Sequence, residues 1–144
     1  MKISTKGRYA LRLMLDIGLH CEEAPVRIKD AAARQEISVK YLEQIVSVLV
    51  KAGYLKSIRG PQGGYRLMKP AKEYKIGMIL RLTEGSLAPV ECLEGDINSC
   101  DRADVCVTLR LWKELDQAIK EVVDKYTLQD LIDWQLDSGS DYVI

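Results

Sequence analysis

Residues 37–68, ISVKYLEQIVSVLVKAGYLKSIRGPQGGYRLM, decide the fold of this chain. Ser38 is a favourable helix N-cap and Gly53 is typical of the position just past a helix C-terminus, so a helix is predicted over 39–52. Its apolar side chains share one face at helical spacing: Leu42, Ile45, Val46 and Leu49. The opposite face is polar, so we expect the helix to rest on a core and turn that face to solvent.

The residues on either side complete a recognisable motif. Two runs of strand-forming residues, 54–59 and 65–68, flank a Gly/Pro-rich turn at 60–64, which predicts a β-hairpin. Upstream, the Ala-rich segment 28–35 predicts a short helix, and the connection QEIS joins it to the helix over 39–52. Two helices joined in this way and followed by a hairpin are typical of a winged helix-turn-helix. We therefore predict a mainly α fold with a small β-hairpin wing.

Apolar periodicity predicts the remaining helices over 8–19, 76–84 and 128–136. A longer helix, predicted over 105–126, carries a near-heptad apolar stripe: Val105, Leu109, Trp112, Leu115, Ile119, Val122 and Tyr126. Such a stripe suits a seam between two copies of the chain. Two copies would also match the two halves of a palindromic DNA site, so we expect a homodimer.

Four regions are expected along the chain. They are a winged helix-turn-helix DNA-binding domain at 1–70, a linker helix with a cysteine loop at 71–104, the dimerisation helix with a terminal helix at 105–135, and a flexible tail at 136–144.

The composition indicates an ordinary globular chain with an uneven distribution of charge. Of the 144 residues, 47% are hydrophobic and 29% are charged, and the net charge is zero. Residues 1–66 carry twelve Lys and Arg against six Asp and Glu, whereas the rest carry nine against fifteen. A basic N-terminal half is the electrostatic footprint of nucleic-acid binding. Without a signal peptide or a membrane-length apolar run, the chain is expected in the cytoplasm with no membrane partner.

Three of the four cysteines form a Cys-x7-Cys-x5-Cys array at residues 92–106. Thiolates at Cys92, Cys100 and Cys106 suit an iron–sulfur cluster or zinc, although they are one short of a closed set of four ligands. Cytoplasmic cysteines in such clusters are more often metal-binding or redox-active than disulfide-bonded. The alternative is three buried or oxidised cysteines. Cys21 lies outside the array and is expected to be structural.

The helix predicted over 39–52 places polar side chains where DNA is read. The residues expected to contact DNA from this helix and its cap are Ser38, Lys40, Tyr41, Glu43 and Gln44. The first three suit phosphate, while the carboxylate and amide of the last two suit cytosine or adenine groups in the major groove. Arg59 on the hairpin suits a narrow minor groove. A solvated helix face is the alternative for Glu43 and Gln44.

Three segments resemble the Rrf2 family of winged-helix transcriptional regulators, whose iron–sulfur members include IscR, NsrR and RirA. They are MKISTKGRYALRLM at the start, ISVKYLEQIVSVLVKAGYLKSIRGPQGGYRL in the middle, and the cysteine array followed by VTLRLW. The resemblance implies a homodimer on a double-stranded DNA operator, with DNA affinity set by a 2Fe-2S or 4Fe-4S cluster. The site residues that it implies are Cys92, Cys100 and Cys106 for the cluster and Arg59, Gly60 and Pro61 for the wing.

The chain departs from the family pattern at two positions. The IscR-type pattern has His three residues after the last cysteine, where this chain has Leu109. The NsrR-type pattern has Asp just before the first-helix Tyr-Ala-Leu-Arg, where this chain has Arg8. The fourth ligand is therefore open among acidic side chains of the loop, a group of the partner chain, an exogenous thiol and water; the acidic candidates are Glu94, Asp101 and Asp104.

These observations predict a DNA-binding regulator without a small-molecule substrate, most simply a cluster-dependent repressor of cluster-biogenesis or cysteine-related genes. A cluster-free regulator whose cysteines bind zinc or sense oxidants is the alternative. A small redox enzyme is less favoured, because the sequence shows no Gly-rich phosphate loop and no nucleophile–base pair.

Overall fold

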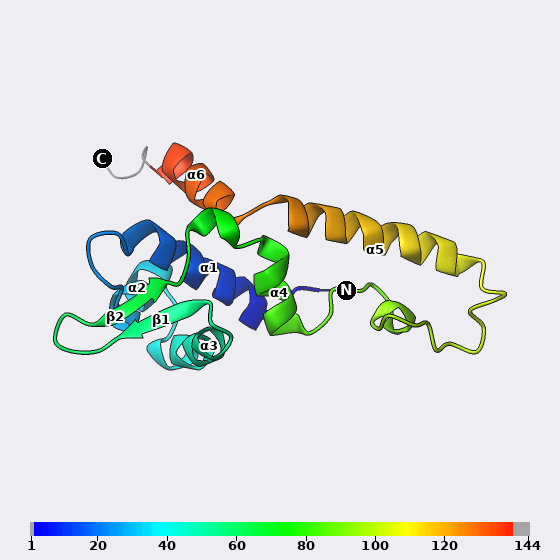
Figure 1. Cartoon of the computed structure of the whole chain (residues 1–144), viewed down its shortest axis with the longest axis horizontal. Coiled ribbons are helices and arrows are strands. Elements are labelled where there is room, and N and C mark those ends of the chain that lie inside the picture. Colours follow the sequence, from blue (N-terminus) through cyan, green and yellow to red (C-terminus); the bar gives the residue numbers. More distant parts are fainter. Residues whose placement is uncertain (1, 140–144) are drawn as a thin grey trace.

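The structure, a computed structural model, describes residues 2–139 and contains six α-helices and one two-stranded antiparallel sheet within them (Figure 1). The elements are α1 (Thr5–His20), α2 (Ile28–Gln35), α3 (Val39–Lys51), β1 (Leu55–Ile58), β2 (Gly64–Leu67), α4 (Ile76–Glu84), α5 (Thr108–Lys125) and α6 (Leu128–Gly139). Short 3-10 turns at Ala71–Glu73 and Glu91–Leu93 precede and follow α4. The predicted winged helix-turn-helix is confirmed.

Three helix boundaries differ by three residues from those predicted. Helix α1 begins three residues earlier, because the Ser4 hydroxyl accepts a hydrogen bond from the Gly7 N–H at 3.1 Å and caps the helix. Helix α5 begins at Thr108 rather than at 105, and α6 continues through Gly139 rather than giving way to a tail at 136. The rest of the predicted tail, residues 140–144, lies outside the described residues. The division into regions stays a prediction.

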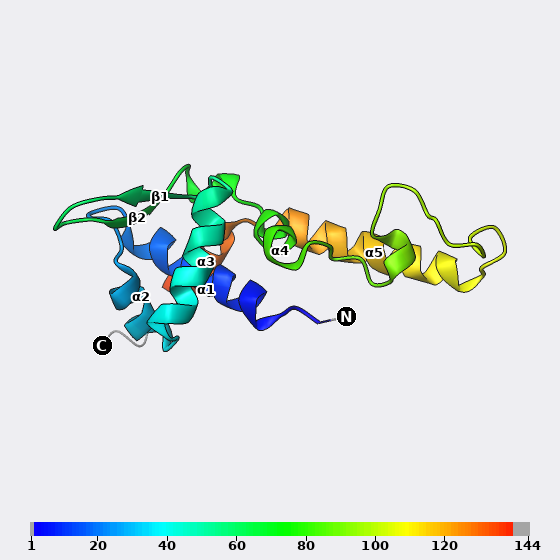
Figure 2. The same ribbon diagram turned by 90° about the horizontal axis from the view of Figure 1, so that it is seen from below.

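Helix α1 is the centre of the core. Its side chains Ala10, Leu13, Met14 and Ile17 are fully buried. Helices α3 and α6 pack on opposite sides of it, as Figures 1 and 2 show together. The inward face of α3 is the one that the sequence predicts, and its four members are buried: Leu42, Ile45, Val46 and Leu49. We call α1 to α4, the wing and α6 the head. Helix α5 extends outward from this head, and the loop that carries the cysteines lies along the part of α5 that is farthest from it (Figure 1).

An ion pair between a buried carboxylate and an exposed arginine fixes α2 to α1. The carboxylate of Asp16 on α1 accepts hydrogen bonds from the Arg34 guanidinium at 2.8 and 2.9 Å and from the Gln35 amide at 3.1 Å. Both partners lie in the last turn of α2, so this helix is fixed to α1 at the point where the turn into α3 begins. Glu36 makes that turn in the left-handed conformation, with φ of 55°, which allows α3 to leave at an angle.

Tyr74 forms the joint between the head and the long helix. Its buried hydroxyl donates to the Tyr54 carbonyl at 2.8 Å and accepts from the Met68 N–H at 2.9 Å. Burial raises the pKa of this hydroxyl, so it stays protonated and keeps donating. The Tyr74 carbonyl accepts from the Leu128 N–H at 2.8 Å, and the Ile76 N–H donates to the Tyr126 carbonyl at 3.0 Å. Residues 74–76 therefore join the wing and the end of α3, through the Tyr74 hydroxyl, to the α5–α6 corner, through backbone hydrogen bonds.

An ion pair between α4 and α5 braces this joint and predicts a pH dependence. Arg81 donates to Asp124 at 2.7 and 2.9 Å, which lowers the pKa of that carboxyl from its ordinary value of 3.8. A lowered folded-state pKa stabilises the protein above the unfolded value and loses that contribution as pH falls through the folded one. Because both side chains are about a third exposed, we expect Asp124→Asn to lower the free energy of unfolding at pH 7 by about 0.5–1 kcal/mol.

That difference should disappear well below pH 3.8, where Asp124 is protonated in both states. Urea unfolding at pH 7 and at the lowest pH where the protein stays folded measures it. Glu114→Gln, the same carboxylate-to-amide change at an exposed position of α5, is the control. If Asp124→Asn lowers the free energy of unfolding equally at both pH values, the charge of the ion pair does not contribute to stability.

Candidate nucleic-acid interface and cysteine loop

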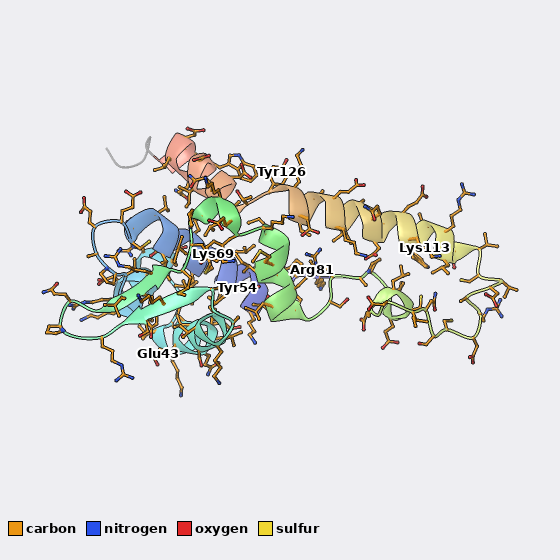
Figure 3. All side chains as sticks on the ribbon, in the orientation of Figure 1. Glu43, Tyr54, Lys69, Arg81, Lys113 and Tyr126 are labelled. Carbon is orange, nitrogen blue, oxygen red and sulfur yellow. The ribbon has the colours of Figure 1, made fainter. Side chains whose placement is uncertain are left out.

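Helix α3 presents an exposed polar face supported by a capped first turn. The Ser38 hydroxyl accepts from the Tyr41 N–H at 3.1 Å, so this side chain shapes the helix start whether or not it also contacts phosphate. Lys40, Glu43 and Gln44 are exposed on the side away from the core, and Figure 3 shows Glu43 at the outer edge of the head. These three side chains are free to reach a groove of DNA.

Tyr41 differs from the other predicted contacts because it is half-buried. Its ring packs edge-on against Tyr9 of α1, with ring centroids 5.5 Å apart and an interplanar angle of 84°. The Arg12 guanidinium lies 5.3 Å from the centroid of Tyr9. Tyr41 therefore supports the position of the α3 N-terminus on α1.

The wing is a short hairpin whose register pairs Leu55 with Leu67 and Ile58 with Gly64. Its tip carries Arg59, Gly60 and Pro61, all exposed. Gly60 has φ of 107°, a conformation that side chains disfavour, which explains the glycine in the turn.

A third segment extends the wing sheet. Val26 exchanges two backbone hydrogen bonds with Tyr65, at 2.9 and 2.8 Å. Gly64 lies against the Val26 carbonyl, where a Cβ atom would overlap it, so glycine is required for this close approach. The next residue, Arg27, donates from its guanidinium to the Pro61 carbonyl at the wing tip. Sequence reasoning missed this contact because residue type alone does not reveal the pairing of residue 26 with the wing.

The three array cysteines lie in one loop but are not gathered. Cys92 is in the 3-10 turn after α4, Cys100 is exposed, and Cys106 lies two residues before the start of α5. All are free thiols, and within residues 2–139 no three His, Cys, Asp or Glu side chains are placed to hold one metal ion. The donors are chemically those of an iron–sulfur cluster, and the loop around them is largely exposed, with Gly95 almost without neighbours. The donor set therefore fits a cluster if the loop closes around it.

Cys106 is the array member best prepared to be a thiolate. Its Sγ lies 3.3 Å from the Thr108 hydroxyl at the start of α5. Hydrogen bonds from this hydroxyl and from nearby backbone N–H groups, together with the charge of Arg102, lower the pKa of the Cys106 thiol. Cys21, by contrast, packs against the hydrophobic core at the end of α1, at the opposite end of the molecule (Figure 1).

The family model described as "Iron-dependent Transcriptional regulator", Rrf2, matches residues 3–134 of this chain. The chain belongs to the Rrf2 family. One similar relative is Protein rrf2 of Nitratidesulfovibrio vulgaris strain Hildenborough, which is 45% identical over 132 residues that span 92% of this chain and 87% of the relative. Rrf2 proteins regulate transcription, so the prediction that the chain is not an enzyme is confirmed, and DNA binding is the family's role.

Two solved structures share the Rrf2 fold over almost the whole chain. CymR, the global cysteine regulator of B. subtilis, has a TM-score of 0.78 and 39% identity, covering 93% of this chain and 98% of CymR. IscR of T. potens has a TM-score of 0.74 and 39% identity, covering 92% of this chain and 87% of IscR. Among the described residues, no helix is long and apolar enough to cross a membrane.

Proposed function

We propose that this Rrf2-family regulator is a repressor whose affinity for a DNA operator is set by an iron–sulfur cluster on Cys92, Cys100 and Cys106. The observation that carries the proposal is the placement of three free thiols in one loop beside α5, in a chain whose α3 exposes a polar face. Its likeness to IscR and to a cysteine regulator supports a role in cluster-biogenesis or cysteine-related genes.

A bound cluster would supply an iron centre that reacts with oxygen or nitric oxide and that ties the loop together while it is intact. The chain's own contribution is to carry the three thiols in one loop and to lower the pKa of the Cys106 thiol through hydrogen bonds from Thr108 and from backbone N–H groups at the start of α5. Leu109, which stands where one family branch has His, offers no ligand atom and is 7% exposed. The fourth position is then held by a weaker or exogenous ligand.

The regulator is proposed to act as a homodimer through a stripe on α5 that shares Leu115 and Val122 with the predicted one and differs in its other members. Leu109, which the sequence pattern placed in the seam, is buried within the protomer, so that assignment was wrong. The exposed apolar stripe instead repeats at spacings of 4, 3 and 4: Leu111, Leu115, Ala118 and Val122. Beside the C-terminal half of α5 lies a cavity of about 250 Å³ lined by Ile3, Leu87, Ile119 and Val123 among others, which adds apolar surface for a second copy.

A cluster-free regulator remains the second candidate, because the cysteines are apart in this structure and no closed ligand set is present among the described residues. Its cysteines would bind zinc or respond to oxidants. Anaerobically purified protein separates the two. The cluster proposal predicts a brown protein with iron and acid-labile sulfide in stoichiometric amounts, whereas colourless protein that binds its operator with full affinity would favour the second candidate.

We expect Glu43→Ala and Gln44→Ala each to cost about 1–3 kcal/mol of binding free energy on a specific operator and little on random duplexes. The reason is that both side chains are exposed in the second turn of α3 and suit base edges rather than phosphates. Titrations on both duplexes at a fixed salt concentration measure the difference. Ser47→Ala, at an exposed position one turn further along α3, is the matched control. Equal losses on specific and random DNA would show that these residues do not read bases.

A further inference from the structure

The wing tip is held to the rest of the head by an arginine at the start of α2. The backbone pairing of Val26 with Tyr65 brings Arg27 alongside the hairpin. From there the Arg27 guanidinium donates to the carbonyl of Pro61, two residues after Arg59. Arg27 also stands at the N-cap of α2, which packs on α3. This side chain therefore links the wing tip to the helix-turn-helix.

The tip has little else to hold it. The strand pairing ends at Ile58 and Gly64, and inside the turn the Gly63 N–H donates to the Gly60 carbonyl at 2.9 Å. Within residues 2–139, the bond from Arg27 is the one hydrogen bond from residues 59–63 to another element. Glycines at 60 and 63 leave the turn many backbone conformations, so it will sample them unless the tip is tied.

We propose that Arg27 is a positioning residue of the DNA interface. It fixes the position of the wing tip, and therefore of Arg59, relative to α3. The inference rests on the proposed function, because it concerns how the wing meets DNA. The physical reason is preorganisation. A tip ordered before binding does not have to lose its conformational freedom when Arg59 enters a narrow minor groove.

Hydrogen–deuterium exchange on the free protein tests the tether without DNA. Arg27→Ala should speed exchange at the amides of Gly60, Gln62 and Gly63 and leave α3 unchanged. Lys29→Ala is the matched control, because it removes the same charge from an exposed position two residues away without touching the wing. Equal exchange at the tip in wild type and Arg27→Ala would overturn the proposal.

A double-mutant cycle tests the consequence for binding. The probe is a duplex selected from random sequences by the wild-type protein, made with A/T-rich or G/C-rich flanks. Arg27→Ala should weaken binding about 3- to 10-fold on A/T-rich flanks, and it should have no further effect in an Arg59→Ala background, because Arg27 acts through Arg59. Lys29→Ala should act equally on both flanks and in both backgrounds.

Other outcomes are distinguishable. An undiminished loss in the Arg59→Ala background, with a salt dependence lower by about one phosphate contact, would make Arg27 a direct phosphate contact and overturn the proposal. If the wild-type protein selects no duplex at all, the proposed function fails, and the exchange experiment still decides whether Arg27 holds the tip.

Discussion

Alanine at Cys92, Cys100 or Cys106 is expected to abolish iron binding and to change operator affinity, whereas Cys21→Ala should keep full iron and wild-type affinity. Each array thiol supplies one ligand, and with three protein ligands there is none to spare. Cys21 instead packs on the core at the other end of the molecule. Iron and sulfide analysis of anaerobic protein, followed by operator titration, measures both effects in the same four variants.

A control variant in the same loop makes this experiment more specific. Ser99→Ala, next to Cys100 in the same exposed loop, should leave iron content unchanged, so that disturbance of the loop alone is separated from loss of a ligand. Full iron in any of the three array variants would remove that thiol from the ligand set. Cluster loss without any change in affinity would break the connection between the loop and DNA binding.

Introducing a charge on the exposed stripe of α5 is expected to dissociate the proposed dimer. Leu111 and Val122 are eleven residues apart, three helical turns, and each is 56% exposed in the single chain. Leu111→Asp or Val122→Asp would bury a carboxylate in an apolar seam, so we expect each to weaken dimerisation by about 2–4 kcal/mol. Light scattering at micromolar concentration should then report monomers where wild type reports dimers.

Gln117→Asp places the same charge on another side of α5 and should leave the dimer intact. Wild-type protein that is itself monomeric, and that binds half-sites singly, would remove the dimer from the proposal altogether.

The elements that local sequence specifies were predicted well. Helix α3 was predicted to within one residue because Ser38 caps it and its four inward residues keep helical spacing, and α4 spans 76–84 as predicted. The wing followed from its paired glycines. These signals are local, since each depends on side chains within a few positions of one another.

What the sequence could not predict depends on partners distant along the chain. The whole apolar stripe of α5 was assigned to a dimer seam. Leu109 of that stripe is buried within the protomer, whereas Leu111, which was not part of it, is exposed. The periodicity fixes which residues share a face but not which neighbour that face meets. The same holds for Arg27, whose role depends on a backbone pairing between Val26 and Tyr65. The cysteine spacing predicts a ligand set, while closure of the loop depends on what binds there.

The joint at Tyr74 has a consequence for the promoter. Backbone hydrogen bonds from Leu128 and to Tyr126 anchor both sides of the α5–α6 corner at residues 74–76, and the Tyr74 hydroxyl ties that point to the wing and to the end of α3. These bonds restrict rotation of the head relative to α5. One added base pair moves a half-site by about 3.4 Å and turns it by about 35° around the helix axis. Operators of this regulator should therefore share one fixed spacer length, and a single inserted base pair should abolish cooperative occupation of the two half-sites.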